Sequence, residues 1–173
     1  MNIFFLDQDP MKCAQAHCDR HVTKMVLETA QILSTVIRNK WDILYGYSIP
    51  QSEKNNPCIK WASNSKENFI WLQTLGKELC KEFEYRYGHQ HASEHIILDA
   101  EYWGLKLASF GITQRPQLMP SEYWDPDPIT AYRNYYLGAK THLLKYTKRT
   151  PPEWVQALEL GEHQDNATIQ LPM

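Results

Sequence analysis

The feature that most constrains the fold is a periodic pattern that runs from about Met11 to Arg38. Core-type residues return at steps of three and four positions, which is the period of a helix buried on one side. They are Val22, Met25, Val26, Thr29, Ile32, Leu33 and Val36. A helix of this length needs other elements to cover its apolar side, so the pattern predicts a mainly α-helical protein.

Three further helical segments are predicted downstream. Residues 65–87 have a helical apolar face and are followed by Gly88, a residue typical of helix ends. Residues 93–109 are helical in pattern but are interrupted by Gly104. Asp127 and Pro128 have the cap-then-proline order that opens a helix, here 128–146. The apolar run 2–6 predicts a strand or a buried extended segment, and 46–57 and 111–128 have the composition of loops.

The length of 173 residues fits one domain with a core of its own. A hydrophobic content of 43% and a charged content of 22% are ordinary for globular proteins. The prediction is therefore an all-α (mainly α) compact single-domain fold over residues 1–154, with a short N-terminal extended segment and long irregular loops. An acidic C-terminal tail is expected over 155–173.

Charge and cysteine usage bound the location and partners. The net charge of -2 provides no global positive field, which counts against strong non-specific DNA binding. We see neither a signal-peptide pattern nor an apolar run long enough for a membrane span. The four cysteines show no CxxC spacing and are expected to be reduced. A cytoplasmic location without a membrane partner is expected (the host cytoplasm if a phage encodes the chain), and the oligomeric state stays open.

A polar face runs along the first predicted helix, opposite its apolar face. It consists of Cys13, His17, His21, Lys24, Glu28, Gln31, Thr35 and Arg38. A solvated helix face is the plain interpretation. Such faces usually carry many Lys–Glu pairs, however, whereas this one begins with two histidines and has one lysine and one glutamate. A His, a Lys and a Glu in a partly covered cleft can perform acid–base or covalent chemistry, so His21, Lys24 and Glu28 are the candidate catalytic residues, flanked by His17 and Gln31.

The last predicted helix and the segment after it are basic and rich in tyrosine. Cations of this kind bind phosphates and aromatic rings stack on bases. The turn "EYRYGHQH" after the middle helix adds further polar groups. The expected substrate-binding residues outside the first helix are Arg86, His91, Arg133, Tyr136, Lys140, Lys148 and Arg149. A basic helix end that only balances its dipole and the acidic tail is the alternative.

Metal binding is a secondary alternative. Cys13, His17 and His21 are spaced by four residues, as are His91 and His95, and a histidine pair at this spacing can share a zinc ion. The full HExxH pattern is missing. No cofactor is therefore expected, with a divalent metal as the alternative.

The order of these features resembles the small helical pyrimidine dimer DNA glycosylases of the endonuclease V type, found in phages and some bacteria. The resemblance rests on a short apolar N-terminal run, on His21 and Glu28 seven residues apart with Gln31 beyond, and on "EFEYRYG", "PSEY" and the basic "KYTKRTPPEW". It spans about residues 2–154. The chain also resembles a group of uncharacterised phage proteins that begin with "NIF-LD".

The glycosylase resemblance implies that a primary amine attacks the sugar C1′ of a damaged nucleotide, with Glu28 as the assisting carboxylate. In that family the amine is the chain's own N-terminus after removal of methionine. Asn2 is a poor context for that removal, so Met1 is expected to supply the amine, and Lys24 is the alternative. Leu27 stands where the family has an arginine.

Several functions stay open from the sequence. The leading hypothesis is a phage-type enzyme acting on DNA bases or nucleotides, either a DNA glycosylase and AP lyase or a base-modifying transferase in which Asp7 and Asp9 hold a metal–pyrophosphate group. The alternative is a non-catalytic phage protein that binds a phosphorylated nucleotide, sequestering a host signal, or that blocks a host defence protein.

Overall fold

The computed structural model describes residues 1–158, and these residues form helices and loops without a β-strand. The mainly α prediction is therefore confirmed. The chain order is α1 (Pro10–Ala16), α2 (Asp19–Trp41), α3 (Pro57–Asn64), α4 (Lys66–Tyr87), α5 (Glu94–Asp99), α6 (Glu101–Gly104) and α7 (Pro128–Ala139). Short 3-10 turns lie at Gln51–Glu53, Ser121–Tyr123 and Thr141–Leu143, and residues 153–158 are helical. In this part of the chain no helix has the length and apolar character needed to cross a membrane.

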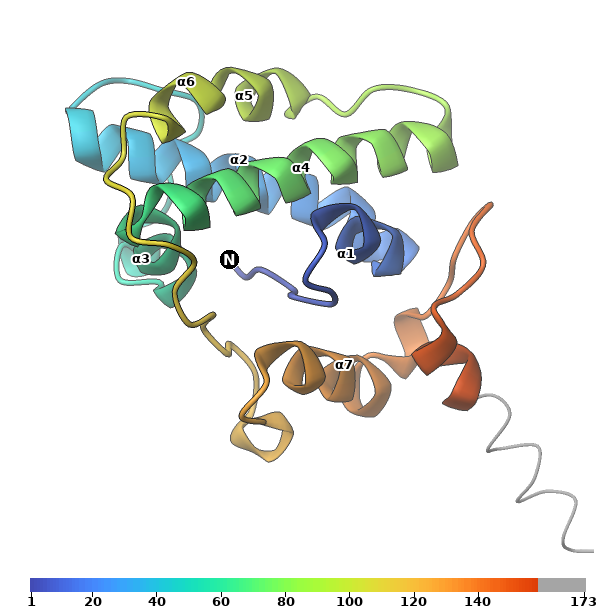
Figure 1. The fold of residues 1–173 in the computed structure, drawn as a ribbon. Coiled ribbons are helices and arrows are strands. Elements are labelled where there is room, and N and C mark those ends of the chain that lie inside the picture. Colours follow the sequence, from blue (N-terminus) through green and yellow to red (C-terminus); the bar gives the residue numbers. More distant parts are fainter. Residues whose placement is uncertain (159–173) are drawn as a thin grey trace, which may run out of the picture.

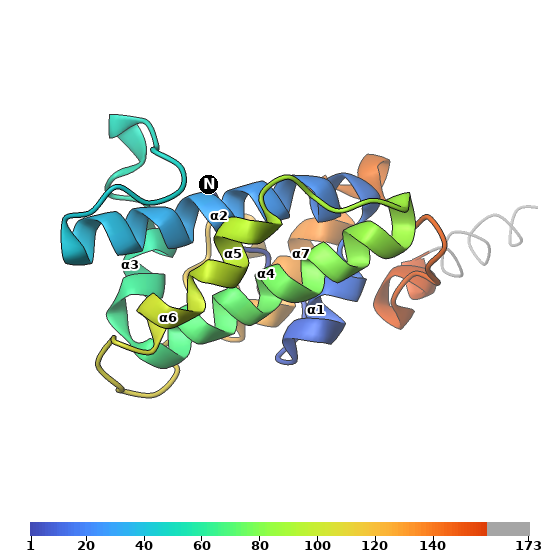
Figure 2. The same ribbon diagram turned by 90° about the horizontal axis from the view of Figure 1, so that it is seen from above.

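The long helices α2 and α4 lie side by side, with α5 and α6 on one side of them and α1 and α3 on the other (Figures 1 and 2). Gly76 of α4 allows the close approach, because a Cβ atom there would lie 2.8 Å from Thr29 of α2 and 2.9 Å from Ile97 of α5. α7 lies apart from this layer, and the N-terminal segment runs between the two (Figure 1).

The N-terminal segment 2–6 is extended and lies at the centre of the core. Phe5 and Leu6 are fully buried. The Phe5 ring packs against Trp61 and Trp71 on the helical layer and against Tyr132 of α7, with ring centroids 5.1, 5.2 and 5.6 Å apart. This segment therefore joins α7 to the rest of the molecule and fixes the position of the N-terminus.

Local capping chemistry explains several helix boundaries. The Asp9 and Asp127 side chains accept backbone N–H bonds at the starts of α1 and α7, each followed by a proline. Ser65 caps α4 in the same way, and α4 ends at Gly88 with a positive φ of 78°. The predicted opening of the last helix and the stop at Gly88 are thereby confirmed, whereas the middle helix begins at Lys66, one residue after its predicted start.

Other boundaries were predicted wrongly. The helix expected over 11–38 is two helices, since the backbone is extended at His17 and Cys18. Cys13 and His17 therefore do not continue the polar face of α2. No helix was predicted where α3 lies, the segment 93–109 forms two short helices, and α7 ends at Ala139 rather than near residue 146. Of the predicted tail, 155–173, only residues 155–158 are among the described residues. Val155 is buried.

Candidate active site

Glu28 lies in the middle of α2, and its side chain is only 12% exposed. One carboxylate oxygen, Oε2, accepts a hydrogen bond from the backbone N–H of Asn2 at 2.8 Å. The other, Oε1, forms an ion pair with Lys24 Nζ at 3.2 Å, one helical turn away. The carboxylate of the predicted catalytic glutamate thus touches both the start of the chain and the one lysine of the predicted face.

The α-amine of Met1 is held by a second carboxylate. Met1 N lies 3.1 Å from Glu53 Oε2. Asn56 Nδ2 donates to the same Glu53 oxygen at 2.8 Å and to the Met1 carbonyl oxygen at 2.7 Å. Neither Glu53 nor Asn56 was singled out as a functional residue from the sequence, because both lie in a segment without periodicity. The only available signal was the Asn56-Pro57 order, which is typical of a helix start.

The Asn2 side chain fixes the next position of the chain. Its Oδ1 accepts from the Tyr132 hydroxyl of α7 at 2.9 Å and from the Ile3 N–H at 2.8 Å. Its Nδ2 donates to the Leu118 carbonyl oxygen at 3.0 Å. The first two residues are therefore bound by contacts from several separate parts of the chain, which makes this terminus an ordered element rather than a free arm.

His21 belongs to α2, and its side chain packs against the N-terminal segment and α7. Its ring stacks on Phe4 with centroids 4.5 Å apart, and its Nδ1 shares a hydrogen bond with the Tyr136 hydroxyl. Burial, followed by the charges of His17, Lys140 and Lys24, lowers the pKa of His21 to about 3. The ring is therefore neutral near pH 7, and Tyr136 is fully buried beneath it.

Among the other residues predicted to lie beside Glu28, His17 is fully buried between α1 and α2. Its Nδ1 donates to the Cys13 carbonyl oxygen, and burial lowers its pKa to about 4. Gln31 is half-buried one turn further along α2. Lys140 ends α7 and lies over the Tyr135 ring at 4.9 Å.

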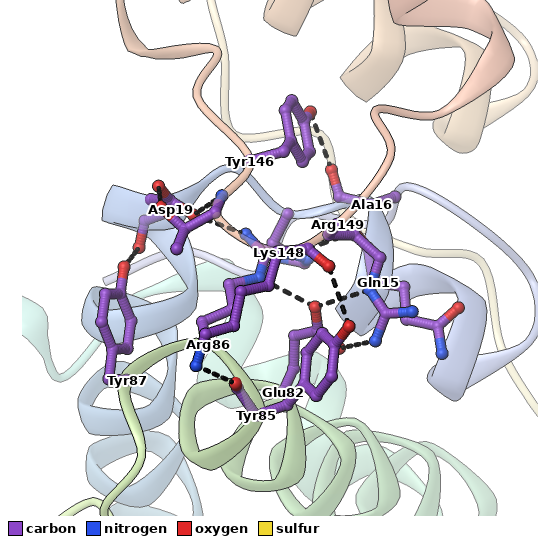
Figure 3. A network of polar contacts seen from close by, with 12 residues as sticks. Gln15, Ala16, Asp19, Glu82, Tyr85, Arg86, Tyr87, Tyr146, Lys148 and Arg149 are labelled. Carbon is purple, nitrogen blue, oxygen red and sulfur yellow. Dashed lines mark hydrogen bonds and ion pairs between the residues drawn. The ribbon is translucent and has the colours of Figure 1, made fainter.

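A separate ionic network uses three of the predicted binding residues (Figure 3). Arg86 is fully buried and pairs with Glu82 at 2.8 Å and with Asp19 at 2.9 Å. Arg149 binds Glu82 through two nitrogens, at 3.0 and 2.7 Å, and Lys148 Nζ donates to the Tyr85 carbonyl oxygen. Asp19 opens α2, which places the network about 14 Å along that helix from Glu28 at 1.5 Å per residue. These side chains hold the segment after α7 against α4 and α2.

The remaining predicted residues are also engaged by the protein itself. Arg133 donates to the Leu6 carbonyl oxygen at 2.9 Å and pairs with Asp7 at 3.2 Å. It lies at the edge of a cavity of about 430 Å³ that also contains Lys12 and Trp154. The His91 Nδ1 accepts from the Ser93 N–H, and burial lowers the pKa of His91.

No group of three or more His, Cys, Asp or Glu residues in the described part of the chain is arranged to hold a metal ion. Asp9, considered for a metal–pyrophosphate group together with Asp7, caps α1. The arrangement that remains, beside the middle of α2, consists of two amines and two carboxylates: Met1, Lys24, Glu28 and Glu53. An amine that can become neutral is a nucleophile for an electrophilic carbon, and an adjacent carboxylate can accept a proton or stabilise a positive charge.

Comparison with known families gives one family model that matches the chain. A family model described as pyrimidine dimer DNA glycosylase matches residues 1–95, which is more than half of the 173-residue chain. The chain belongs to this family. The match includes Met1, Lys24, Glu28, Glu53 and Asn56, whereas α7 and the basic segment lie beyond it. No curated protein and no solved structure matches the chain.

Proposed function

We propose that this protein is a DNA glycosylase with an associated lyase activity, in which Glu28 and a neighbouring amine perform the reaction. The observation that carries the proposal is the 2.8 Å contact between Glu28 Oε2 and the Asn2 backbone nitrogen. A mostly buried carboxylate in the middle of a long helix is thereby placed at the first peptide bond of the chain. Membership of the pyrimidine dimer DNA glycosylase family supports DNA as the substrate.

The proposed reaction starts with the neutral amine. Its nitrogen attacks C1′ of the damaged nucleotide, the glycosidic bond breaks, and the base leaves with the bonding electrons and takes up a proton. The C1′–O4′ bond then opens, O4′ gains a proton, and the nitrogen loses its two protons to form an imine. Glu28 is placed to stabilise the positive charge that develops at the sugar and at the iminium nitrogen.

Strand cleavage follows by β-elimination. A base, for which Glu28 is the candidate, removes a proton from C2′, a C2′–C3′ double bond forms, and the bond from C3′ to its phosphate oxygen breaks. Water then hydrolyses the imine and returns the free amine. Amine, carboxylate and water supply every group in this sequence, so the proposed reaction uses no cofactor.

Two amines compete for the role of nucleophile. Lys24 forms an ion pair with Glu28, but its side chain is 60% exposed to water. Met1 precedes the residue whose nitrogen touches Glu28, and an α-amine is ordinarily a weaker base than a lysine side chain. The N-terminal amine is therefore the preferred nucleophile.

The α7 side of the site offers cations for the DNA backbone. We assign a phosphate contact to Lys140, because its charge acts on His21 and its nitrogen lies over the Tyr135 ring without an acidic partner in the described chain. Arg86 and Arg149 are excluded from this role by their buried carboxylate partner, Glu82. DNA binding is expected to weaken with salt but with a shallow slope, since few cations take part.

The test is borohydride trapping of the purified protein on ultraviolet-irradiated, abasic and undamaged duplex DNA. Reduction of the imine should leave a covalent adduct on the first two and none on the third. Glu28→Gln should remove at least about 99% of the trapping rate, the loss expected for a group that acts on the reacting atoms. The matched control is Glu84→Gln, an exposed glutamate of α4, which should keep full activity.

Either of two results would refute this function. The first is the absence of an adduct on all three DNAs with protein whose thermal unfolding is normal. The second is a fully active, folded Glu28→Gln variant.

A further inference from the structure

Met1, Glu53 and Asn56 are joined by a closed set of hydrogen bonds. The Met1 ammonium donates to Glu53 Oε2, the Asn56 amide donates to that same oxygen, and the Asn56 amide also donates to the Met1 carbonyl oxygen. Three residues thus hold one another through three hydrogen bonds of 2.7–3.1 Å. Both polar groups of Met1, its amine and its carbonyl, are bound by the same pair of side chains.

The orientation of Asn56 is fixed by the helix that follows it. Its Oδ1 accepts from the Cys58 N–H at 2.8 Å, which caps the start of α3. The amide nitrogen is then the end that must point to Met1 and Glu53. The hydrogen bonds from Asn56 and from the Met1 amine together lower the pKa of Glu53, so this carboxylate is charged throughout the neutral range.

This geometry differs from an ordinary surface ion pair. Exposed pairs of two long side chains contribute little, because both chains lose freedom when they pair. Here the amine belongs to the backbone, the Met1 side chain is only 7% exposed, and Glu53 comes from a short 3-10 turn. The pair therefore costs little conformational freedom and specifies where the amine lies.

We propose that Glu53 and Asn56 form a seat that positions the α-amine of Met1, the nucleophile of the proposed function. The inference rests on the proposed function. It implies that Met1 is retained, because a chain that starts at Asn2 would leave Glu53 and Asn56 without their partner. Glu53 is a positioning residue: it holds the Met1 amine one residue away from the nitrogen that touches Glu28.

Two substitutions of Glu53 separate its charge from its hydrogen bond to the Met1 amine. A carboxylate beside an ammonium stabilises the charged form, which cannot attack C1′. Glu53→Gln keeps an oxygen that accepts the hydrogen bond but removes the negative charge. Glu53→Gln should therefore keep more of the trapping rate than Glu53→Ala, because its amide oxygen can still accept from the Met1 amine. Glu53→Ala also removes the hydrogen bond and should lower the trapping rate at its best pH several-fold.

A second measurement tests the seat without DNA. Reductive methylation with formaldehyde and cyanoborohydride labels amines, and peptide mapping gives the rate at Met1. Removing the seat, by Glu53→Ala or by Asn56→Ser, should speed labelling of Met1 several-fold at pH 7. Serine retains a capping oxygen for α3 but cannot reach Met1. The matched control is Glu122→Ala, an exposed glutamate in another 3-10 turn, which should leave the rate unchanged.

The outcomes separate the two proposals. A trapped adduct on Met1, a lower trapping rate in Glu53→Ala and faster labelling in both seat variants would support the seat. An adduct on Met1 with unchanged trapping and labelling rates in the seat variants would refute the seat alone. An intact mass that lacks Met1, with an adduct on Asn2, would refute the seat and leave the glycosylase proposal standing. The absence of any adduct would refute the glycosylase proposal, even with faster labelling in the variants.

Discussion

Acid sensitivity of folding follows from the two histidines buried behind the site. Burial lowers the pKa of His17 to about 4 and of His21 to about 3, whereas an unfolded histidine has a pKa of about 6.5. Below pH 6.5 the unfolded chain binds protons that the folded chain excludes, so stability is fully present above that pH and falls as the solution is acidified. At pH 5 a histidine in the unfolded chain is more than about 90% charged, so His17 and His21 each lower the unfolding free energy by about 2 kcal/mol.

The expected loss between pH 8 and pH 5 is therefore about 4 kcal/mol for the pair. Urea denaturation at the two pH values measures it. His17→Asn and His21→Asn should each reduce the difference by about 2 kcal/mol, whatever they do to stability at pH 8, because asparagine does not titrate. His95→Asn, at an exposed position on α5, is the control and should leave the difference unchanged. A difference of less than about 1 kcal/mol in the wild type would refute the reasoning.

Two further substitutions test the packing that positions the site. Glu82→Ala should lower the unfolding free energy by about 3–5 kcal/mol, because it leaves the buried Arg86 with one carboxylate partner fewer. The control is Glu84→Ala, at an exposed position, which should change the unfolding free energy by less than about 0.5 kcal/mol in the same urea titration. Gly104→Ala should lower the unfolding free energy by about 1–3 kcal/mol and the melting temperature with it, since the new Cβ would lie 2.4 Å from the ring of the fully buried Phe69. Unchanged stability in either variant would contradict the packing described.

The helices that the sequence predicts best are those with local signals. α4 has an apolar face and a stop at Gly88, and α7 opens with Asp127 and Pro128. Such boundaries depend on bonds between neighbouring residues, which the sequence displays directly.

The break between α1 and α2 depends instead on distant contacts. No glycine or proline marks His17 and Cys18. Asp19 N–H donates to the Lys145 carbonyl oxygen, and the Asp19 carboxylate accepts from Thr147 and Arg86. These partners lie far away along the chain, so helical periodicity alone predicts a continuous helix.

The candidate site divides in the same way. Lys24 and Glu28 share a helix face and were found by their spacing. The amine partners Glu53 and Asn56 lie in an aperiodic segment, and only the folded chain brings them to Met1. Arginine is a residue type expected of a phosphate ligand, but Arg86 is buried and pairs with Glu82 and Asp19 instead.

The most direct test of the central claim is the mass of the protein peptide that carries DNA after borohydride reduction on an ultraviolet-irradiated duplex. The account predicts one modified peptide, which begins at Met1 and carries the sugar remnant on its α-amine. An adduct on Lys24 would contradict the choice of the α-amine, and the absence of a DNA-bearing peptide would contradict the proposed chemistry.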